Sequence, residues 1–256
     1  MGSLYPETFR QRRRGRFGEP YLYARECAST QELLHDPSLP EGAVAVADHQ
    51  TSGRGRLGRA WEDAAGGSLL CSVLLRPDGG ALPQLSLVTA LATAEAIDEV
   101  TGLATHVKWP NDVLLDGRKV SGILLEAIES RVVAGIGINV NQTEEELPAR
   151  TRLAPGSLLV ATGRRHDRAD LLATLLLRLE LAYDAWCSRG LDAVRGALDA
   201  RSALRGHAVR VDGKAGVAGG LAPGGGLEVV LRSGETVVIE SGEVELLELG
   251  GGVDVG

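Results

Sequence analysis

The chain has 256 residues, enough for one large domain and a second small one, and its 44% hydrophobic and 24% charged residues are typical of a globular protein. Its net charge of −7 argues against a uniformly basic protein, and it contains neither an apolar run of membrane-spanning length nor the apolar core of a secretory signal near its start. Cys27, Cys71 and Cys187 are odd in number and far apart, so we expect no disulfide framework or zinc site, and a cytoplasmic location fits best.

Residues 1–19 are rich in arginine, with five in positions 10–16. Basic tails can bind nucleic acid through its phosphates. This segment is too short to form a helix-turn-helix, which needs two packed helices. The simpler interpretation is a disordered, solvated basic tail.

The next part of the chain alternates apolar strand patterns with helical ones. Strands are predicted over 21–24, 43–48, 68–76, 104–108, 112–115, 120–127 and 131–140. A capping box over 29–32 predicts a short helix that runs through 33 and 34, and further helices are predicted over 83–100, 170–189 and 191–201, with 144–167 as a surface connection. Because the strands are mostly grouped rather than strictly alternating with helices, the class is α+β, a mixed sheet with flanking helices.

The character of the chain changes near residue 203. Short strands separated by glycine-containing turns are predicted over 207–211, 215–221, 227–231, 235–240 and 243–249. Short strands with regular turn signals are typical of a small β-barrel. We therefore place a domain boundary there.

The most distinctive stretch is 53–59, which contains three glycines and three arginines directly after a buried strand. Glycine lets a backbone approach a ligand closely, and guanidinium groups match carboxylate and phosphate oxygens. The same residues fit G-x-G-x-x-G, but a glycine-broken loop and a strand follow, not the helix that a dinucleotide site requires. The stretch predicts a mobile loop that closes over an anionic small molecule; an exposed basic turn is the alternative.

Lysine is rare: of 27 basic residues only three are lysines, and Lys108 and Lys119 lie within twelve residues of each other. A compact ammonium group performs contacts that a planar guanidinium cannot. The spacing alone is weak support for a site.

Four segments together resemble biotin protein ligase, the biotin–[acetyl-CoA-carboxylase] ligase family. They are 50–61 (QTSGRGRLGRAW), 108–112 (KWPND), 117–126 (GRKVSGILLE) and 135–139 (GIGIN). The resemblance extends over about residues 20–250. It implies a catalytic domain over 20–203, with a fold like that of class II aminoacyl-tRNA synthetases, and an SH3-like β-barrel over 204–250.

The resemblance implies a two-step reaction. Biotin and ATP give biotinyl-5′-AMP and pyrophosphate, and biotin then passes to a lysine of a biotin carboxyl carrier domain. Both reactants of the first step are anions, so cations must offset their repulsion.

The resemblance assigns the cations and one carboxylate to catalysis. Lys119 lies between the biotin carboxylate and the α-phosphate, Arg54 is the arginine of the biotin loop, and Arg56 closes over the adenylate. Asp112 orients or deprotonates the acceptor lysine, or merely holds the turn after Trp109. An exposed strand lysine is the structural alternative for Lys119.

The remaining biotin-binding positions also follow from the resemblance. They are Ser29, Thr30, Gln31, Gln50, Gly53, Gly55, Gly122, Gly135 and Gly137, with Arg54, Arg56 and Lys119. Gln31 departs from the asparagine common in the family. Helix capping by Ser29 and Thr30, a loop amide at Gln50, and tight packing at the glycines are the structural alternatives.

The implied ATP-binding residues are Arg54, Arg56, Arg59, Trp61, Lys108, Asn111, Asp112, Lys119 and Asn139. Arg59 can equally form a structural ion pair, and Asn139 can simply form a turn. Mg²⁺ is expected with ATP. No carboxylate cluster in the sequence marks its ligands, so metal-binding residues stay unassigned.

The expected partners are a carboxyl carrier domain, biotin and ATP, with no specific nucleic acid and no membrane; a homodimer is left open. Some family members carry an N-terminal DNA-binding domain and act as repressors. This chain starts almost at the ligase core, so we expect an enzyme without operator binding. The alternatives are a nucleic-acid-binding, biotin-responsive regulator and a lipoate or octanoate ligase of the same fold.

Overall fold

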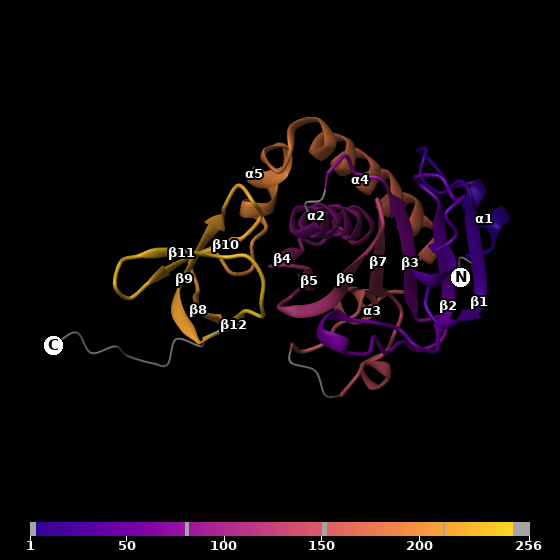
Figure 1. The fold of residues 1–256 in the computed structure, drawn as a ribbon. Helices are drawn as coiled ribbons and strands as arrows, with labels where there is room; N and C mark the ends of the chain where they lie inside the picture. The colour runs from indigo at the N-terminus through magenta and orange to yellow at the C-terminus, as the bar shows by residue number, and fades with distance from the viewer. Residues whose placement is uncertain (1–3, 80–81, 150–152, 212, 248–256) are drawn as a thin grey trace.

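The computed structural model describes residues 4–79, 82–149, 153–211 and 213–247. A seven-stranded sheet forms its centre, with strand order β1-β2-β3-β7-β6-β5-β4 (Figure 1). β1 and β2 are parallel, and every other neighbouring pair is antiparallel. The strands are β1 (Tyr21–Cys27), β2 (Val44–Gln50), β3 (Ser68–Leu75), β4 (His106–Lys108), β5 (Asp112–Leu115), β6 (Arg118–Ile128) and β7 (Arg131–Asn139). The mixed sheet expected from the sequence is confirmed.

Two features of the sheet follow directly from the sequence. β3 lies in the middle, and all eight of its residues are buried, which explains its continuous apolar run. Asp116 and Gly117 join β5 to β6 with φ angles of 50° and 72°. Such a two-residue turn with both φ values positive matches the twist of the strands that it joins.

Two long helices, α2 (Leu82–Thr101) and α4 (Arg168–Arg189), pack against each other over one face of this sheet (Figure 1). α2 is buried on several sides because it lies between the sheet and α4. The Asp167 side chain caps the start of α4, and Gly190, with φ of 66°, ends it. Further helices are α5 (Asp192–Ala200), the short α3 (Leu158–Thr162), and the 3₁₀ turns η1 (Glu32–Leu34), η2 (Arg56–Gly58) and η3 (Glu144–Glu146).

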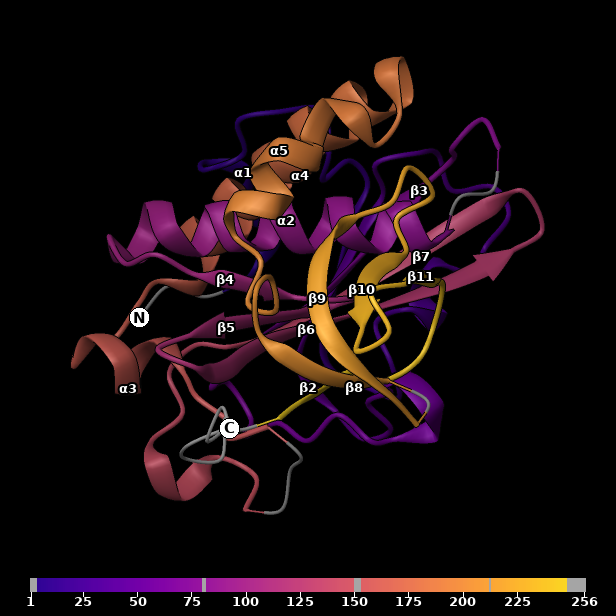
Figure 2. The same ribbon diagram turned by 90° about the vertical axis from the view of Figure 1, so that its left-hand side faces the viewer.

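A second sheet of five antiparallel strands lies beyond the β4 edge, at the opposite end of the molecule from β1 (Figures 1 and 2). Its strands are β8 (Ala208–Val211), β9 (Lys214–Leu221), β10 (Leu227–Leu231), β11 (Thr236–Ile239) and β12 (Glu245–Leu246), in the order β11-β10-β9-β8-β12. The SH3-like arrangement of short antiparallel strands is confirmed. Within the described residues no ladder joins β11 to β12, so the barrel is not closed.

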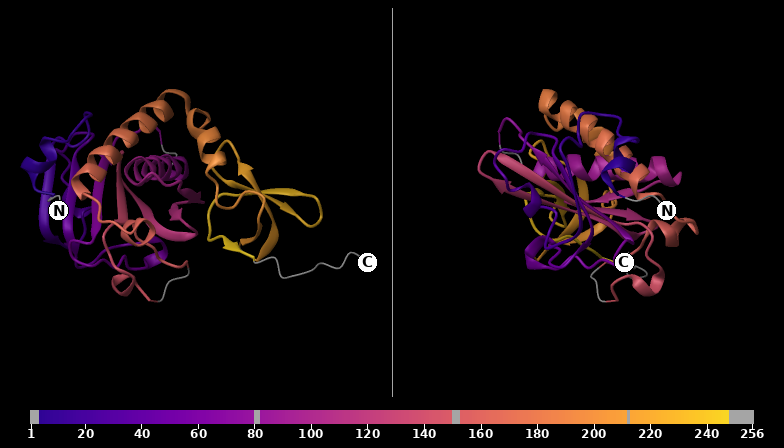
Figure 3. Two further views of the ribbon diagram at one scale, coloured as in Figure 1. Left: turned by 180° about the vertical axis from the view of Figure 1, so that it is seen from behind. Right: turned by 90° about the vertical axis from the view of Figure 1, so that its right-hand side faces the viewer.

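α4 and α5 lead from the large sheet to the small one (Figure 3). The predicted domain boundary near residue 203 falls between α5 and β8, and the last two residues of the predicted strand 243–249 lie outside the described residues. No helix in the described part of the chain is long and apolar enough to cross a membrane.

The N-terminal segment differs from the predicted disordered tail. Helix α1 (Pro6–Arg10) places Phe9, which is fully buried, against Tyr21 at a ring-centroid distance of 4.4 Å. Arg12 pairs with Asp170 on α4 at 2.6 Å, and Arg16 contacts Asp184 on the same helix. These arginines attach the segment to the domain, so part of the charge available to nucleic acid is neutralised internally.

Candidate active site

A cavity of about 660 Å³ collects the residues predicted from the sequence. Its wall comes from β6, β7, the turn at 29–31, the loop 53–62, and residues 242–244 of the C-terminal region. We call residues 53–62 the flap. Every predicted site residue lines the cavity except Gly53. A side chain on Gly53 would meet the Trp61 carbonyl oxygen at 2.5 Å, so this glycine allows the two arms of the flap to approach each other.

The floor of the cavity is bare backbone. Gly122 on β6 lies opposite Gly137 on β7. A Cβ atom at either position would contact the indole ring of Trp61. A Cβ on Gly137 would lie 2.5 Å from the Trp61 ring. The sequence placed Trp61 with ATP, but its side chain lies over two of the glycines assigned to biotin. Trp61 therefore covers the part of the cavity whose glycines were assigned to biotin.

The turn at 29–31 is held rigidly at one end of the cavity. Thr30 donates to the Gln50 Oε1 from its backbone N at 2.7 Å and from its hydroxyl at 3.0 Å. Gln31 is buried above Gly135 and donates to the Leu124 carbonyl at 3.1 Å. Because these polar groups are buried and already oriented, they form a wall that can select the polar atoms of a ligand.

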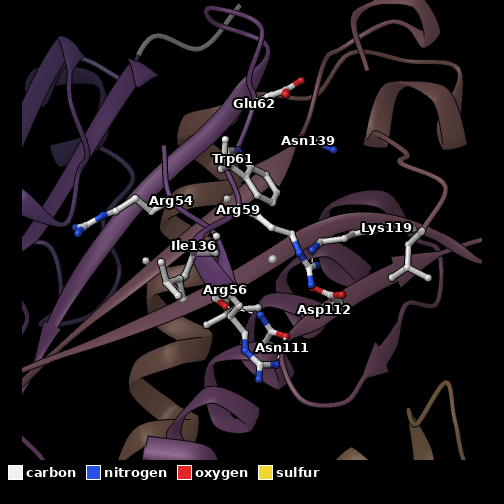
Figure 4. Close-up of a pocket in the computed structure, with 18 of the residues that line it drawn as sticks. Arg54, Arg56, Arg59, Trp61, Glu62, Asn111, Asp112, Lys119, Ile136 and Asn139 are labelled. Atoms are coloured by element: carbon white, nitrogen blue, oxygen red, sulfur yellow. Dashed lines mark hydrogen bonds and ion pairs between the residues drawn. The ribbon is translucent and has the colours of Figure 1, made fainter. Parts of the chain in front are cut away.

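At the other end, cationic side chains converge (Figure 4). Lys119 pairs with Asp112 at 2.6 Å, and its Nζ lies 5.9 Å from the centre of the Trp61 ring. Arg56 donates to the Asn111 Oδ1 at 3.1 Å. Burial lowers the pKa of Arg56 from its ordinary value. A cation held in such partly desolvated surroundings attracts an anion more strongly than one in water.

The two other flap arginines form ion pairs with carboxylates of the protein. Arg59 forms an ion pair with Glu243 from the C-terminal region, the structural alternative weighed for it in the sequence. Arg54 pairs with Glu126 at 2.9 Å and points away from Lys119 in Figure 4. Both arginines line the cavity.

Two predicted ATP-binding residues are tied into the protein framework. Lys108 is only 8% exposed and donates to the Val244 carbonyl at 2.8 Å. The Asn139 amide donates to the Gly156 carbonyl at 2.9 Å and accepts from Gln142 at 3.1 Å. Each still lines the cavity, and their contact with ATP stays a prediction.

Sequence reasoning missed part of the wall. It includes Glu62, Cys71, Pro148, Leu153, Pro155 and residues 242–244. Burial raises the pKa of the Cys71 thiol to about 12, so this cysteine is an apolar wall residue, not a nucleophile. The other positions carry no motif and reach the cavity only through tertiary packing.

Within the described residues, no group of three or more His, Cys, Asp or Glu side chains is placed to hold a metal ion. Metal ligands, unassigned from the sequence, therefore stay unassigned. The arrangement offers a glycine floor, a polar turn, five cationic residues that line one cavity, and the Asp112 carboxylate beside the Lys119 ammonium group. Such a site can bind an apolar acid next to a polyanion.

Comparisons with known proteins agree with this geometry. Residues 24–142 match the model of the biotin/lipoate A/B protein ligase family. The chain is 39% identical over 188 residues to the bifunctional ligase/repressor BirA of Bacillus subtilis, covering 70% of this chain and 58% of that protein. It is 37% identical over 202 residues to the biotin–[acetyl-CoA-carboxylase] ligase of Paracoccus denitrificans, covering 73% and 82%.

Among solved structures, the biotin protein ligase of Aquifex aeolicus in complex with biotin and ATP superposes with a TM-score of 0.81 at 35% identity, covering 88% of this chain and 97% of that one. The chain thus spans little more than half of the bifunctional relatives but nearly all of the Aquifex chain. With the site geometry and more than two thirds of the Paracoccus relative matched, the chain belongs to the biotin/lipoate A/B protein ligase family.

Proposed function

We propose that the protein is an ATP-dependent biotin protein ligase. It joins biotin to ATP, releases pyrophosphate, and transfers biotin from biotinyl-5′-AMP to a lysine of a biotin carboxyl carrier domain. The observation that carries this proposal is a single cavity in which a glycine floor under Trp61 adjoins Lys119, Asp112 and Arg56. The names of the Paracoccus and Aquifex relatives support biotin and ATP as the substrates.

In the first step, a biotin carboxylate oxygen attacks the α-phosphorus of ATP, and the bond to the departing pyrophosphate breaks. Lys119 contacts both negatively charged groups and offsets their repulsion while the new bond forms. Arg56, whose guanidinium donates to Asn111, supplies a second charge at this end of the cavity. Mg²⁺ accompanies ATP as part of the substrate and neutralises its outer phosphates.

In the second step, the acceptor amine attacks the acyl carbon, the bond to AMP breaks, and the amine loses a proton. Asp112 is the carboxylate nearest to this event, since it lies 2.6 Å from Lys119. We assign it the orientation of the incoming lysine and the acceptance of its proton. The free cysteines Cys27, Cys71 and Cys187 support a reducing compartment, and we place the enzyme in the cytoplasm. These steps do not depend on the oligomeric state.

A lipoate or octanoate ligase is the second candidate, because the matched family model includes lipoate ligases. Isothermal calorimetry with biotin and with lipoate, each with and without ATP, separates the two. The proposal expects binding of biotin that ATP strengthens. Selective binding of lipoate would replace biotin ligation by lipoate ligation.

The first prediction concerns Lys119. Lys119→Ala is expected to lower biotin-dependent pyrophosphate release by about 100-fold or more, because one preorganised charge at the transition state is lost. Lys214→Ala, at an exposed lysine of β9, is the matched control and is expected to leave the rate unchanged. An unaltered rate in Lys119→Ala, with its unfolding curve unchanged, would overturn the role of this lysine.

A further inference from the structure

Arg54 lines the cavity, yet its guanidinium group is directed away from it (Figure 4). Its Nη2 donates to the Glu126 Oε2 at 2.9 Å, whereas Lys119, Asp112 and Arg56 gather elsewhere around the cavity. The anion that Arg54 contacts is thus a carboxylate of the protein itself. A substrate carboxylate can therefore form an ion pair with Arg54 only if it displaces Glu126.

Glu126 is placed for such an exchange. Residues two apart on a strand share a face, so Glu126 follows Gly122 and Leu124 along the cavity side of β6 but lies just beyond the cavity wall. Its other oxygen, Oε1, lies 3.6 Å from Nε2 of His35, directly after the 3₁₀ turn η1. The carboxylate keeps this neighbour when Arg54 departs, so it is not left isolated.

The ion pair is also weak enough to break. The Arg54 side chain is 41% exposed and that of Glu126 29%. A pair this accessible to water is worth no more than about a fivefold change in an equilibrium constant. The flap itself need not unfold, because the hydrogen bond from the Trp61 N to the Gly53 O and the one from the Gly55 N to the Arg59 O lie outside the exchange.

We propose that Glu126 is a positioning residue that holds Arg54 outside the cavity until the carboxylate of the acid substrate displaces it. The inference rests on the proposed function, since biotin supplies that carboxylate. The protein exists in two states, one with Arg54 on Glu126 and one with Arg54 turned into the cavity. Only the second state binds the acid through this arginine, so Glu126 lowers the apparent affinity for it.

The test is biotin binding by Glu126→Gln, measured by calorimetry without nucleotide. This variant keeps the shape of the side chain and removes its charge. Its Kd for biotin is expected to be about two- to fivefold lower than that of the unmodified protein at low salt. The difference is expected to shrink at high salt, where the ion pair is already screened. Tighter binding is a result that damage to the fold would not produce.

Two further variants make the test specific. Glu129→Gln removes a charge at an exposed position at the end of the same β6–β7 hairpin and is expected to leave the Kd unchanged. In an Arg54→Gln background, which itself binds biotin more weakly, the addition of Glu126→Gln is expected to have no effect. Equal or weaker binding by Glu126→Gln, or an increase that persists without Arg54, overturns the proposal.

Failure of the proposed function gives a different result. In that case the unmodified protein does not bind biotin, and the same series is measured with lipoate, whose carboxylate presents the same charge. A Glu126 effect with lipoate would sustain the exchange while refuting biotin ligation. The absence of the effect with whichever acid binds would refute the exchange alone.

Discussion

Trp61 illustrates how single residues define the pocket. Its ring lies on Gly137 and Gly122, where any larger residue would displace it. Its indole Nε1 is buried and has no hydrogen-bond partner among the described residues. An unpaired buried N–H costs about 1–3 kcal/mol. The indole is thus held by ring packing and by the nearby Lys119 ammonium group, and an acceptor atom of a bound ligand would remove the cost of the unpaired N–H.

His166 provides a residue-scale prediction of pH dependence. Burial, and to a lesser extent the nearby Arg164, lowers its pKa from the usual value of about 6.5. Between its folded pKa and 6.5 the unfolded chain therefore binds more protons, so stability is complete above pH 6.5 and falls as the pH decreases through this window. Between pH 7.5 and 5.5, the unfolding free energy of His166→Gln is expected to decrease less than that of the unmodified protein. Chemical denaturation measures both.

The exposed His207 is the matched control, and His207→Gln is expected to keep the slope of the unmodified protein. A slope in His166→Gln as steep as in the unmodified protein would contradict the role given to His166.

At the scale of elements, α1 shows that a basic segment need not be a tail. Arg12 and Arg16, which follow α1, pair with acidic residues of α4, while Phe9 and Phe17 are buried. The charges thus anchor a segment whose apolar residues extend the core. The arginines are evident in the sequence, but the acidic partners of Arg12 and Arg16 lie more than 150 residues away along the chain.

Phe9→Ala is therefore expected to lower the free energy of unfolding by about 3–5 kcal/mol, as for other buried phenylalanines. Urea denaturation measures it. Arg10→Ala, at an exposed position of the same helix, is the control and is expected to change stability little. If the segment were disordered, neither substitution would change the free energy of unfolding.

At the scale of the whole molecule, the C-terminal sheet completes the cavity. Lys108 donates to the Val244 carbonyl, Trp109 donates to the Gly225 carbonyl at 2.9 Å, and Arg59 pairs with Glu243. Each contact joins a residue of the recognised motifs to the small sheet. Docking of the small sheet therefore also shapes this end of the cavity.

Trp109→Phe tests this coupling, since it removes the donor to the buried Gly225 carbonyl. We expect a loss of about 1–3 kcal/mol of unfolding free energy and a several-fold weaker affinity for ATP, measured by denaturation and calorimetry. Tyr21→Phe removes a comparable donor, to the Leu4 carbonyl at 2.8 Å, on β1 at the opposite edge of the large sheet, and is expected to lower stability alone. Unchanged ATP affinity in Trp109→Phe would show that docking of the small sheet does not affect nucleotide binding.

The sequence by itself determined the elements whose cause is local. The apolar run of β3, the Asp116–Gly117 turn and the cap and stop of α4 depend on neighbouring residues, so they were predictable. The motif residues of the cavity were predictable through their resemblance to a known family. Their contacts were not, because a motif fixes the residue type and not its partner.

Only the tertiary structure decided which partner each charged group takes. It paired Arg54 with Glu126, Arg59 with Glu243 and the N-terminal arginines with α4, and it brought residues 242–244 to the cavity. The physical reason is the distance along the sequence over which each kind of interaction acts. Backbone conformation is set within a few residues, whereas an ion pair or a cavity wall joins positions that become neighbours only when the chain has packed.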